Sequence, residues 1–569
     1  PAGSTSATAR REENLLYQPQ AAPADPWLWE MLYAPQTLQT TLDLDAVTTE
    51  APALLRVAVW AASEAPANPD HRLLVRVNGQ QVGLAEWDGR GATFFDSAVP
   101  PGVLVAGSNS IELDAPGDTA APLDSIGIDW LELHYARPPV ATDERLTFTG
   151  TGALLELLGL QSDAVAVYNI TAPYSATLEL RTAGGAPLGF TGAAEQRYAA
   201  VGTGGYRTPT RLEPVTTAPA ISVTSDGADY LAIGAPELLE AVGPLLDYHT
   251  ANGLTTLALP WEAVVNEFHG GMPEPAAIRA LLQHARQHWQ RVPSYLLLVG
   301  DATYDPRGYV DAPPPHMLPA PMVLTEYGGE TASDLPLADL DGDSIPDLAV
   351  GRIPAHTPAQ VRALVERTLD YAAAPAPPAR VLAVADGQEA RFWRDAQQFL
   401  QPFAADTALL TSTPGSADAP QQIAQALAPG QRMVAYFGHG SLTQWGQDRL
   451  LDTASLAILP DAAAPLMLHF TCLTGLFTHP TRESLTEALL WHAGGPVVVL
   501  APTSLTLPDD QGFLARALAA TLATQPDQTI GAALVQVWQQ LPPDQRMQPG
   551  VQDVLQTFLL FGDPALLPK

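Results

Sequence analysis

The segments MVAYFGHG (residues 433–440) and PLMLHFTCLTGLF (residues 465–477) determine which class of fold this chain adopts. Each contains a short, nearly uninterrupted apolar run, and each then passes into glycine and small polar residues. Short apolar runs of this kind are typical of strands that are buried on both faces. Because such strands occur in parallel sheets covered by helices, the two segments predict an α/β/α domain.

Residues 222–569 repeat this rhythm, since apolar runs alternate with longer amphipathic stretches. The predicted strands are Tyr230–Ile233, Tyr295–Leu298, Leu348–Val350, Val381–Val384, Met433–Tyr436, Leu466–Phe470 and Val497–Leu500. The predicted helices are Pro236–Ala251, Pro275–Arg291, Pro358–Ala373, Arg391–Phe403, Gln421–Leu427, Ser484–His492 and Gln511–Ala523. This alternation predicts a mostly parallel sheet, whose ligand sites are expected beyond the carboxyl ends of its strands.

The first 225 residues have a different pattern, in which runs of alternating polarity are separated by Pro and Gly. Such runs, with Asn78-Gly79 as a hairpin turn, predict antiparallel β-sandwich structure. We expect a jelly-roll-like module over residues 25–136 and a small β domain over residues 145–221. Residues 1–24 show no periodicity and are expected to be a loose tail. The N-terminal module is a candidate for binding carbohydrate through Trp87, although the sequence favours a role of Trp87 in the core or packed under a loop.

The composition excludes several classes of partner. The chain of 569 residues has 28 Lys and Arg against 61 Asp and Glu, a net charge of −33. A nucleic-acid binder needs a basic surface, so no nucleic-acid partner is expected. No apolar run approaches the ~20 residues of a membrane span. The single cysteine, Cys472, excludes a disulfide framework.

Cys472 and His439 form the candidate catalytic pair. Each follows a predicted buried strand, and the sequence between them is long enough for one crossover between parallel strands. A thiol with a pKa near ~8.5 needs a base to become a nucleophile, and an imidazole at the neighbouring strand end supplies one. The N–H groups of Gly440 and Cys472 are the candidate oxyanion hole. The alternative is that Cys472 is a buried core residue, as free cysteines often are.

The neighbours of this pair are the candidate substrate pocket. Ser441 and Trp445 follow His439, and Thr471 precedes Cys472, so all three are expected beside the bound substrate.

A wider set of motifs resembles the gingipain-like cysteine peptidases, family C25 of the caspase-like clan. They are YFGHGSLTQWG (436–446), PLMLHFTCLTGLF (465–477), LTEALLWHAGGPVVVLAPTS (485–504), LLFGDPALLPK (559–569), YLLLVGDATYD (295–305) and ETASDLPLADLDGDSIPDLAVGRIPA (330–355). The resemblance implies a caspase-like α/β/α fold, with Cys472 as nucleophile, His439 as catalytic histidine and Gly440 in the oxyanion hole. It also places Asp386 where the arginine-directed members have a Glu that supports the histidine. The alternative for Asp386 is a solvated Asp-Gly turn.

The same resemblance leaves the specificity undefined. The arginine-directed members close the substrate pocket with a tryptophan, and residues 501–508 here read APTSLTLP without one. The nearest acidic residues to the matching pocket segment are Glu389 and Asp395.

An acidic loop is the candidate metal site. Asp339, Asp341, Asp343 and Asp347 surround a glycine turn, and hard oxygen ligands at such spacing suit Ca²⁺. Gingipains carry calcium, so the resemblance also implies a structural Ca²⁺ here, and no organic cofactor is expected. Asp301 and Asp305 are expected to form a neighbouring loop of similar use. The alternative is a solvated acidic loop without an ion.

The sequence therefore predicts an extracellular or cell-surface cysteine endopeptidase that hydrolyses protein or peptide substrates through a thiol acyl-enzyme. Residues 145–221 are expected to serve as a pro-domain of a calcium-stabilised zymogen. Two alternatives stay open: a non-hydrolytic surface binding or assembly protein, and a transpeptidase on the same fold.

Overall fold

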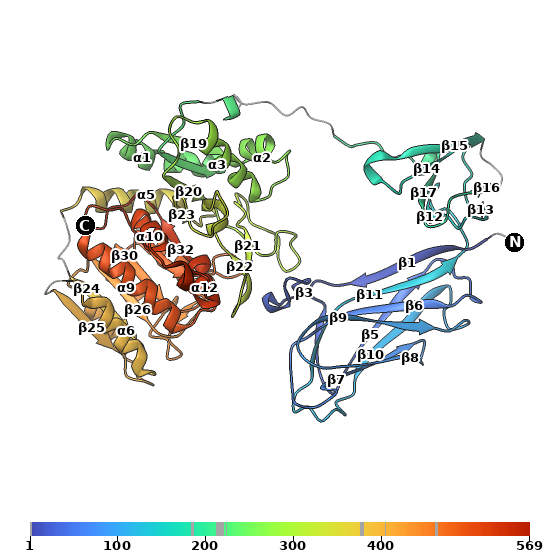
Figure 1. Cartoon of the computed structure of the whole chain (residues 1–569), viewed down its shortest axis with the longest axis horizontal. Coiled ribbons are helices and arrows are strands. Elements are labelled where there is room, and N and C mark those ends of the chain that lie inside the picture. Colours follow the sequence, from blue (N-terminus) through green and yellow to red (C-terminus); the bar gives the residue numbers. More distant parts are fainter. Residues whose placement is uncertain are drawn as a thin grey trace. The chain divides into compact units, whose positions relative to one another are not determined.

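The computed structural model describes residues 3–183, 187–211, 221–223, 225–375, 380–403, 406–460 and 465–569. The chain forms two compact units, residues 1–215 and residues 216–569. Each unit is described by itself (Figure 1).

The first unit begins with an antiparallel β-sandwich, as predicted. One sheet has the order β1-β11-β6-β9, with β4 paired to β11, and the other has the order β5-β10-β7-β8. The strands are β1 (Thr5–Glu12), β4 (Glu30–Tyr33), β5 (Gln36–Leu44), β6 (Ala53–Ala61), β7 (His71–Val77), β8 (Gln80–Trp87), β9 (Gly91–Val99), β10 (Gly107–Ala115) and β11 (Ser125–Arg137). Apolar residues that alternate along these strands fill the space between the two sheets.

The N-terminal residues are part of this sandwich. Strand β1 pairs with β11 along its whole length, from Thr5 opposite Arg137 to Glu12 opposite Trp130. The Thr5 hydroxyl is buried and donates to the carbonyl of Thr149 at 2.8 Å. The prediction of a loose tail over residues 1–24 is therefore wrong for the described part, because backbone pairing and not side-chain periodicity holds this strand.

The turn between β7 and β8 is the predicted one. Asn78 and Gly79 have φ of 49° and 79°, which is the conformation of a type I′ hairpin. Trp87, at the end of β8, is half-buried and packs against His71 and Phe95, with ring centroids 5.1 and 5.3 Å away. The structure thus favours the packing role of Trp87 over a sugar platform.

A smaller group of strands completes the first unit. They are β12 (Arg145–Thr149), β13 (Leu154–Leu157), β14 (Ala164–Asn169), β15 (Thr177–Ala183), β16 (Leu188–Thr191) and β17 (Arg197–Gly202). Four of them form the antiparallel sheet β12-β17-β14-β15, and β13 pairs with β16. Phe148, Phe190 and Tyr198 form its aromatic core.

The second unit is built on a sheet of ten strands in the order β19-β18-β20-β23-β32-β31-β30-β26-β24-β25 (Figure 1). The strands are β18 (Tyr230–Gly234), β19 (Thr256–Pro260), β20 (Tyr295–Val299), β23 (Ala349–Ile353), β24 (Val381–Ala385), β25 (Thr407–Thr411), β26 (Met433–Phe437), β30 (Leu466–Phe470), β31 (Val498–Pro502) and β32 (Phe558–Gly562). All neighbours are parallel except β31 and β32, which run antiparallel. The sheet therefore consists of two parallel halves that run in opposite directions and meet at β32.

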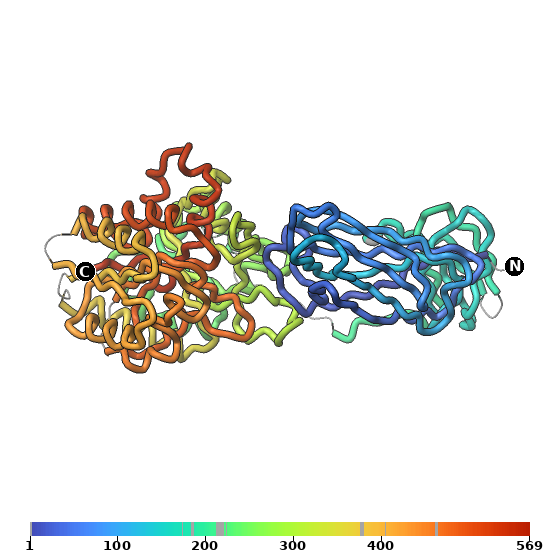
Figure 2. Tube along the Cα trace, turned by 90° about the horizontal axis from the view of Figure 1, so that it is seen from below, coloured from blue at the N-terminus to red at the C-terminus, as the bar shows by residue number. Residues whose placement is uncertain are grey.

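Helices cover both faces of this sheet. The main ones are α1 (Pro236–Ala251), α2 (Trp261–Phe268), α3 (Ala276–His288), α5 (Pro358–Ala373), α6 (Ala390–Leu400), α7 (Ala419–Leu427), α8 (Leu485–Trp491), α9 (Pro508–Thr524), α10 (Ile530–Gln539) and α12 (Pro549–Thr557). Buried residues of α1, α5, α7 and α8 pack on one face, and those of α6, α9, α10 and α12 pack on the other. Figure 2 shows the C-terminal helices, in red, along one side of the unit. The predicted α/β/α architecture with a mostly parallel sheet is confirmed.

Among the described residues, no helix combines the length and apolar composition needed to cross a bilayer.

Candidate active site

The strand register brings Cys472 and His439 to one edge of the sheet. Strands β26 and β30 are parallel neighbours, and Phe437 pairs with Phe470. His439 and Cys472 each lie two residues beyond that pair. The imidazole and the thiol therefore follow their strands at the same level of the sheet, beyond its carboxyl end. Gly440 lies directly against this turn: a Cβ at residue 440 would lie 2.8 Å from the Cys472 carbonyl oxygen and would clash with the Thr471 hydroxyl.

Cys472 rests as a thiol. Its Sγ donates to the carbonyl oxygen of Thr506 at 3.4 Å. Burial raises the pKa of Cys472, and hydrogen bonding from Thr506 opposes that shift. Because the thiol is protonated at neutral pH, a base must remove its proton before attack.

His439 is held by a carboxylate. Its Nε2 lies 3.1 Å from Glu389 Oε1, and both side chains are about half exposed. Its ring and that of Phe392 pack in a T-shaped arrangement, with centroids 5.2 Å apart. When Nε2 carries the proton donated to Glu389, Nδ1 of the neutral ring is unprotonated. Nδ1 is then the atom that can accept the Cys472 proton.

Asp386 does not support the imidazole. Its side chain is buried, Oδ1 accepts from the backbone N–H of Gln388 at 3.1 Å, and within the described chain Oδ2 has no hydrogen-bond partner. It lies beside Tyr436, whose pKa is raised well above its usual value by burial and by the Asp386 charge. The prediction that Asp386 pairs with His439 is wrong, and so is the alternative of a solvated turn. The residue directly after β24 points inward, whereas Glu389, at the start of α6, reaches the ring.

The hairpin after His439 leaves the Gly440 N–H free for an oxyanion. In this hairpin, β27 (Gly440–Ser441) pairs with β28 (Gln444–Trp445). Gly446 N–H donates to the His439 carbonyl at 2.7 Å, so the next pair, Gly440 with Trp445, is a non-hydrogen-bonded one. No bond from the Cys472 N–H occurs within the described residues either. Neither of the two predicted donors thus has a backbone acceptor among the described residues.

Two predicted pocket residues lie behind the site and not at its surface. Trp445 is fully buried and stacks on Tyr436, with ring centroids 4.4 Å apart and planes 2° from parallel. Thr471 is also fully buried. Neither can contact a substrate, so these two predictions are wrong, while Ser441 is half exposed. The sequence did not single out Leu505 and Leu507, which are exposed on either side of buried Thr506.

Only some of the carboxylates of the acidic loop lie close together. Carboxylate oxygens of Asp339, Asp341 and Asp347 lie within 4.8 Å of one another, and Asp343 is outside this group. Both Asp339 oxygens accept backbone N–H groups of the loop itself. Arg286 lies 3.6 Å from Asp341 and 3.2 Å from Asp347. Backbone N–H groups and one arginine therefore offset part of the charge of these three carboxylates.

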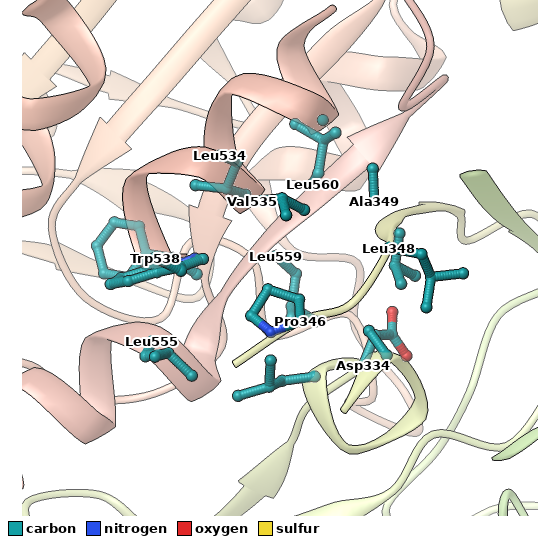
Figure 3. Close-up of a pocket in the computed structure, with 15 residues that line it drawn as sticks. Asp334, Pro346, Leu348, Ala349, Leu534, Val535, Trp538, Leu555, Leu559 and Leu560 are labelled. Atoms are coloured by element: carbon teal, nitrogen blue, oxygen red, sulfur yellow. The ribbon is translucent and has the colours of Figure 1, made fainter. Parts of the chain in front are cut away.

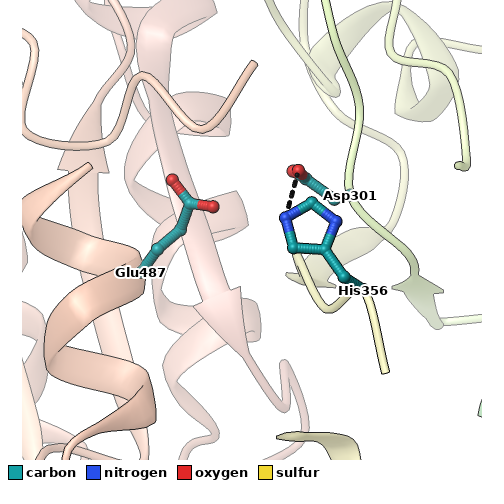
Figure 4. Close-up of side chains that lie close together, drawn as sticks. All are labelled: Asp301, His356 and Glu487. Carbon is teal, nitrogen blue, oxygen red and sulfur yellow. Dashed lines mark ion pairs between the residues drawn. The ribbon is translucent and has the colours of Figure 1, made fainter. Parts of the chain in front are cut away.

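A second cluster is buried. Asp301, His356 and Glu487 offer one ligand atom each within 4.8 Å, from segments far apart in the sequence (Figure 4). His356 Nε2 lies 3.2 Å from Asp301 Oδ2, while Asp301 Oδ1 and His356 Nδ1 are buried without a partner in the described part of the chain. Burial raises the pKa of Asp301 and of Glu487, and their mutual repulsion adds to the shift for Glu487. A cavity of about 260 Å³ adjoins the three side chains.

An apolar cavity lies elsewhere in the unit, away from Cys472 and His439. It is lined mainly by residues of β23, α10, α12 and β32, including Leu348, Leu534, Trp538 and Leu560 (Figure 3). It includes neither Cys472 nor His439, and apolar side chains form nearly all of its lining.

Comparison with known proteins places this geometry in a family. A family model described as peptidase family C25 matches residues 223–569. The chain belongs to peptidase family C25. The C25 match covers the strands that carry Cys472 and His439, and C25 is a family of cysteine peptidases. The predicted resemblance is confirmed. A search of curated proteins finds no match to the chain.

Several solved structures are similar to the chain. Dimeric latent PorU from Porphyromonas gingivalis is 17% identical, with a TM-score of 0.50 over 65% of this chain and 38% of PorU. The Arg-specific cysteine proteinase gingipain R (RgpB) is 19% identical, with a TM-score of 0.48 over 59% of this chain and 78% of that protein. A carbohydrate-binding module, CBM36, solved with calcium and xylotriose, is 15% identical, with a TM-score of 0.15 over 23% of this chain and 98% of the module. At these identities the likeness to PorU shows the fold of the C25 domain.

Proposed function

We propose that this C25 member is a cysteine endopeptidase that works through Cys472 and His439. The observation that carries the proposal is the register of β26 and β30, which sets thiol, imidazole and the Gly440 N–H at one sheet edge. The Glu389 carboxylate supports it, because an Nε2–H donated to Glu389 leaves Nδ1 of the neutral His439 ring as the base.

The reaction uses only these groups. His439 Nδ1 takes the proton of Cys472 Sγ, and the thiolate attacks the carbonyl carbon of the scissile bond. The N–H groups of Gly440 and Cys472 stabilise the oxyanion. When the C–N bond breaks, the imidazolium returns its proton to the leaving amine, which leaves a thioester on Cys472. Water then attacks the thioester with His439 as base and releases the carboxylic acid product.

A peptide-library cleavage profile tests the proposal, with Cys472→Ala as the blank. We expect cleavage by the parent protein, none by Cys472→Ala, and loss of covalent labelling by a peptidyl chloromethyl ketone in His439→Ala. Ser416→Ala, a change in the loop after β25, is the matched control and should label normally. Equal cleavage by parent and blank would overturn the assignment.

Two alternatives on the same site are separated by the products. A transpeptidase passes the acyl group to an amine, so a competing amine would appear in the product at the expense of the acid. A non-hydrolytic binding protein would give no product and no labelling at Cys472. Hydrolysis is favoured because the half-exposed His439 opens the site to water.

We further propose that the domain holds a divalent cation. Of the two clusters in this domain, that of Asp301, His356 and Glu487 fits an ion better, because its two carboxylates are buried and it has unpartnered ligand atoms. An imidazole ligand is typical of Zn²⁺, whereas the Asp339 loop offers only oxygen and suits Ca²⁺. Such an ion would neutralise two buried carboxylates and tie α8 to the ends of β20 and β23.

Thermal unfolding in Ca²⁺, in Zn²⁺ and in chelator distinguishes the two clusters. If the buried cluster binds the ion, Asp301→Asn abolishes the stabilisation and Asp341→Asn preserves it. The control His479→Gln changes a residue that lines the same cavity outside the cluster. The opposite pattern would assign the ion to the acidic loop. If neither Ca²⁺ nor Zn²⁺ stabilises the parent protein, neither cluster binds these ions.

The remaining roles concern the first unit and the location. We propose that residues 145–221 restrain the peptidase as a pro-domain, that the N-terminal sandwich binds carbohydrate, and that the protein acts outside the cell or on its surface. Phe94 on β9 is exposed, with the Arg56 guanidinium over one face of its ring, and is the candidate aromatic contact of the sandwich. Activity before and after limited proteolysis between the two units tests the pro-domain, and affinity electrophoresis in xylan tests the sandwich with Phe94→Ala as the variant.

A further inference from the structure

The first turn of α8 contacts both segments that contain the candidate catalytic pair. The N–H of Leu485 donates at 2.7 Å to the carbonyl of Leu442, in the hairpin that follows the catalytic histidine. The N–H of Thr486 donates at 3.0 Å to the carbonyl of Thr474, two residues after the nucleophile. Leu485 and Thr486 are fully buried. One helical turn thus connects the hairpin after β26 to the turn after β30.

The same turn contains a capping box. The first N–H groups of an α-helix have no carbonyl acceptor within the helix, so other groups must accept them. In α8 the N–H of Glu487 donates to Ser484 Oγ at 3.3 Å, and the N–H of Ser484 donates to Glu487 Oε2 at 2.8 Å. These two bonds join the Glu487 side chain to the backbone. Because Leu485 and Thr486 lie between the two residues, a shift of the Glu487 side chain displaces their N–H groups as well.

Glu487 also belongs to a buried cluster outside the catalytic pair. It offers a ligand atom within 4.8 Å of ligand atoms of Asp301 and His356 (Figure 4), and all three residues line a cavity of about 260 Å³. Asp301 Oδ1 and His356 Nδ1 are buried, and neither has a hydrogen-bond partner in the described part of the chain. Two carboxylates this close repel each other, whereas a cation attracts both. The position of Glu487 therefore depends on the charge held in the cluster.

We propose that the first turn of α8 is a positioning element for Cys472 and His439. A divalent cation bound by Asp301, His356 and Glu487 holds this turn in place, so the ion acts on the catalytic pair through backbone hydrogen bonds. The inference rests on the cation site and the catalytic pair of the proposed function, but it can be measured without any peptide substrate.

Hydrogen exchange and alkylation of the full-length protein test the inference. Amide exchange of residues 484–488 and the rate of Cys472 alkylation by iodoacetamide are measured with Ca²⁺, with Zn²⁺ and with chelator. Unbound Zn²⁺ is first removed by gel filtration, because it would also bind the thiol. We expect the ion to slow exchange by about 10–100-fold, the effect of a ligand at 10–100 times its dissociation constant on local opening. Alkylation should become faster, because the imidazole must face the thiol to accept its proton.

Variants of the cluster show whether the ion acts through Glu487. Glu487→Gln keeps the capping box, which accepts Glu or Gln, but removes the charge that attracts the ion. In this variant neither exchange nor alkylation should respond to Ca²⁺ or Zn²⁺. The matched control is Asp311→Asn, which removes a carboxylate from the lining of the same cavity outside the cluster and should respond as the parent protein does.

Variants of Leu485 test the backbone connection itself. Leu485→Pro removes the N–H that bonds to Leu442, and proline is tolerated at the first position of a helix. The extended backbone of Ser484, with φ of −71° and ψ of 164°, suits a residue that precedes proline. We expect slow alkylation of Leu485→Pro both with and without the ion. The control Leu485→Ala truncates the buried side chain but keeps the N–H, and should retain the response to the ion.

The outcomes separate this inference from the proposed function. If the ion raises the Tm and slows exchange but leaves the alkylation rate of Cys472 unchanged, its role is structural only and the proposal is overturned. A parent protein that cleaves peptides and responds to neither ion also overturns it, while the peptidase proposal stands. If exchange and alkylation respond as expected but no peptide is cleaved, the peptidase proposal fails and the positioning role of α8 stands.

Discussion

Replacement of Arg352 by Met should destabilise the C25 domain more than any surface change. Arg352 lies in β23, is fully buried, and makes two bonds to the Asp334 carboxylate at 2.7 and 2.9 Å. It also donates to the carbonyls of Gly300 and Leu318, each at 3.0 Å. Its guanidinium lies 5.0 Å from the ring centroid of Phe477, in the segment that follows Cys472.

The magnitude follows from what the change leaves behind. Met fills most of the volume but leaves the Asp334 carboxylate buried and unpaired, and removal of one partner of such a pair typically costs about 3–5 kcal/mol. For a domain of this size, with an unfolding entropy of about 0.7 kcal/mol/K, that loss lowers the Tm by about 4–7 °C. Because Arg352 also packs against Phe477, in the segment after Cys472, Cys472 should then react with an alkylating reagent at more than one rate.

Urea unfolding followed by tryptophan fluorescence measures the change. The matched control is Arg380→Met, because Arg380 pairs with Asp406 at 3.1 Å on the surface, where such pairs contribute about 1 kcal/mol or less. The double variant Arg352→Met/Asp334→Asn should recover about 2 kcal/mol relative to the sum of the single changes. If Arg352→Met costs no more than Arg380→Met, the description of Arg352 and Asp334 as a strongly stabilising buried ion pair is wrong.

Three further predictions concern the site and the first unit. Gly440→Ala should abolish peptide cleavage while leaving the fold intact by circular dichroism, because its Cβ would clash with Thr471 and displace the oxyanion donor. Glu389→Gln should lower kcat/KM only about 2–5-fold, since the pair with His439 is half exposed and such pairs contribute about 0.2–1 kcal/mol; a hundredfold loss would contradict this. Burial and nearby carboxylates raise the pKa of Asp129 to about 7, so the folded state binds the proton more tightly than the unfolded chain does. The free energy of unfolding of the first unit should therefore fall as the pH rises from about 4 to about 7, and Asp129→Asn should flatten that slope in urea titrations.

The sequence predicted those elements whose ends contain recognisable start signals, such as a proline or a capping residue. The bounds of α1 and α5 agree with the prediction, because each helix starts at a proline, and α5 also has the capping box of Thr357 and Gln360. The edge strands β19 and β25 were not predicted, since their burial is partial and their apolar pattern is weak. Strand β32 was missed for another reason: its place between the two sheet halves depends on pairing with strands that are distant in the sequence.

The site was predictable at the strand ends and not beyond them. Parallel register follows from buried strands and crossovers, so the edge shared by Cys472 and His439 could be anticipated. The carboxylate that pairs with the His439 ring could not be predicted. Asp386 and Glu389 both follow β24, and only the reach of their side chains distinguishes them. The same holds for Asp301, His356 and Glu487, where the sequence indicated only Asp301 as a candidate ligand.

The turn that contains Cys472 is held by hydrogen bonds to residues that are distant in the sequence. Leu473, directly after Cys472, has φ of 64°, a conformation that is unfavourable for a non-glycine residue and persists only when its surroundings enforce it. Its N–H donates to the Ser504 carbonyl at 3.2 Å, and Ser504 follows Thr503, whose carbonyl and hydroxyl both bond to the strand Gly329–Ala332. That strand belongs to a hairpin inserted between β20 and β23. The hairpin between β20 and β23 therefore helps to hold the backbone that presents the thiol, although the two lie far apart in the sequence.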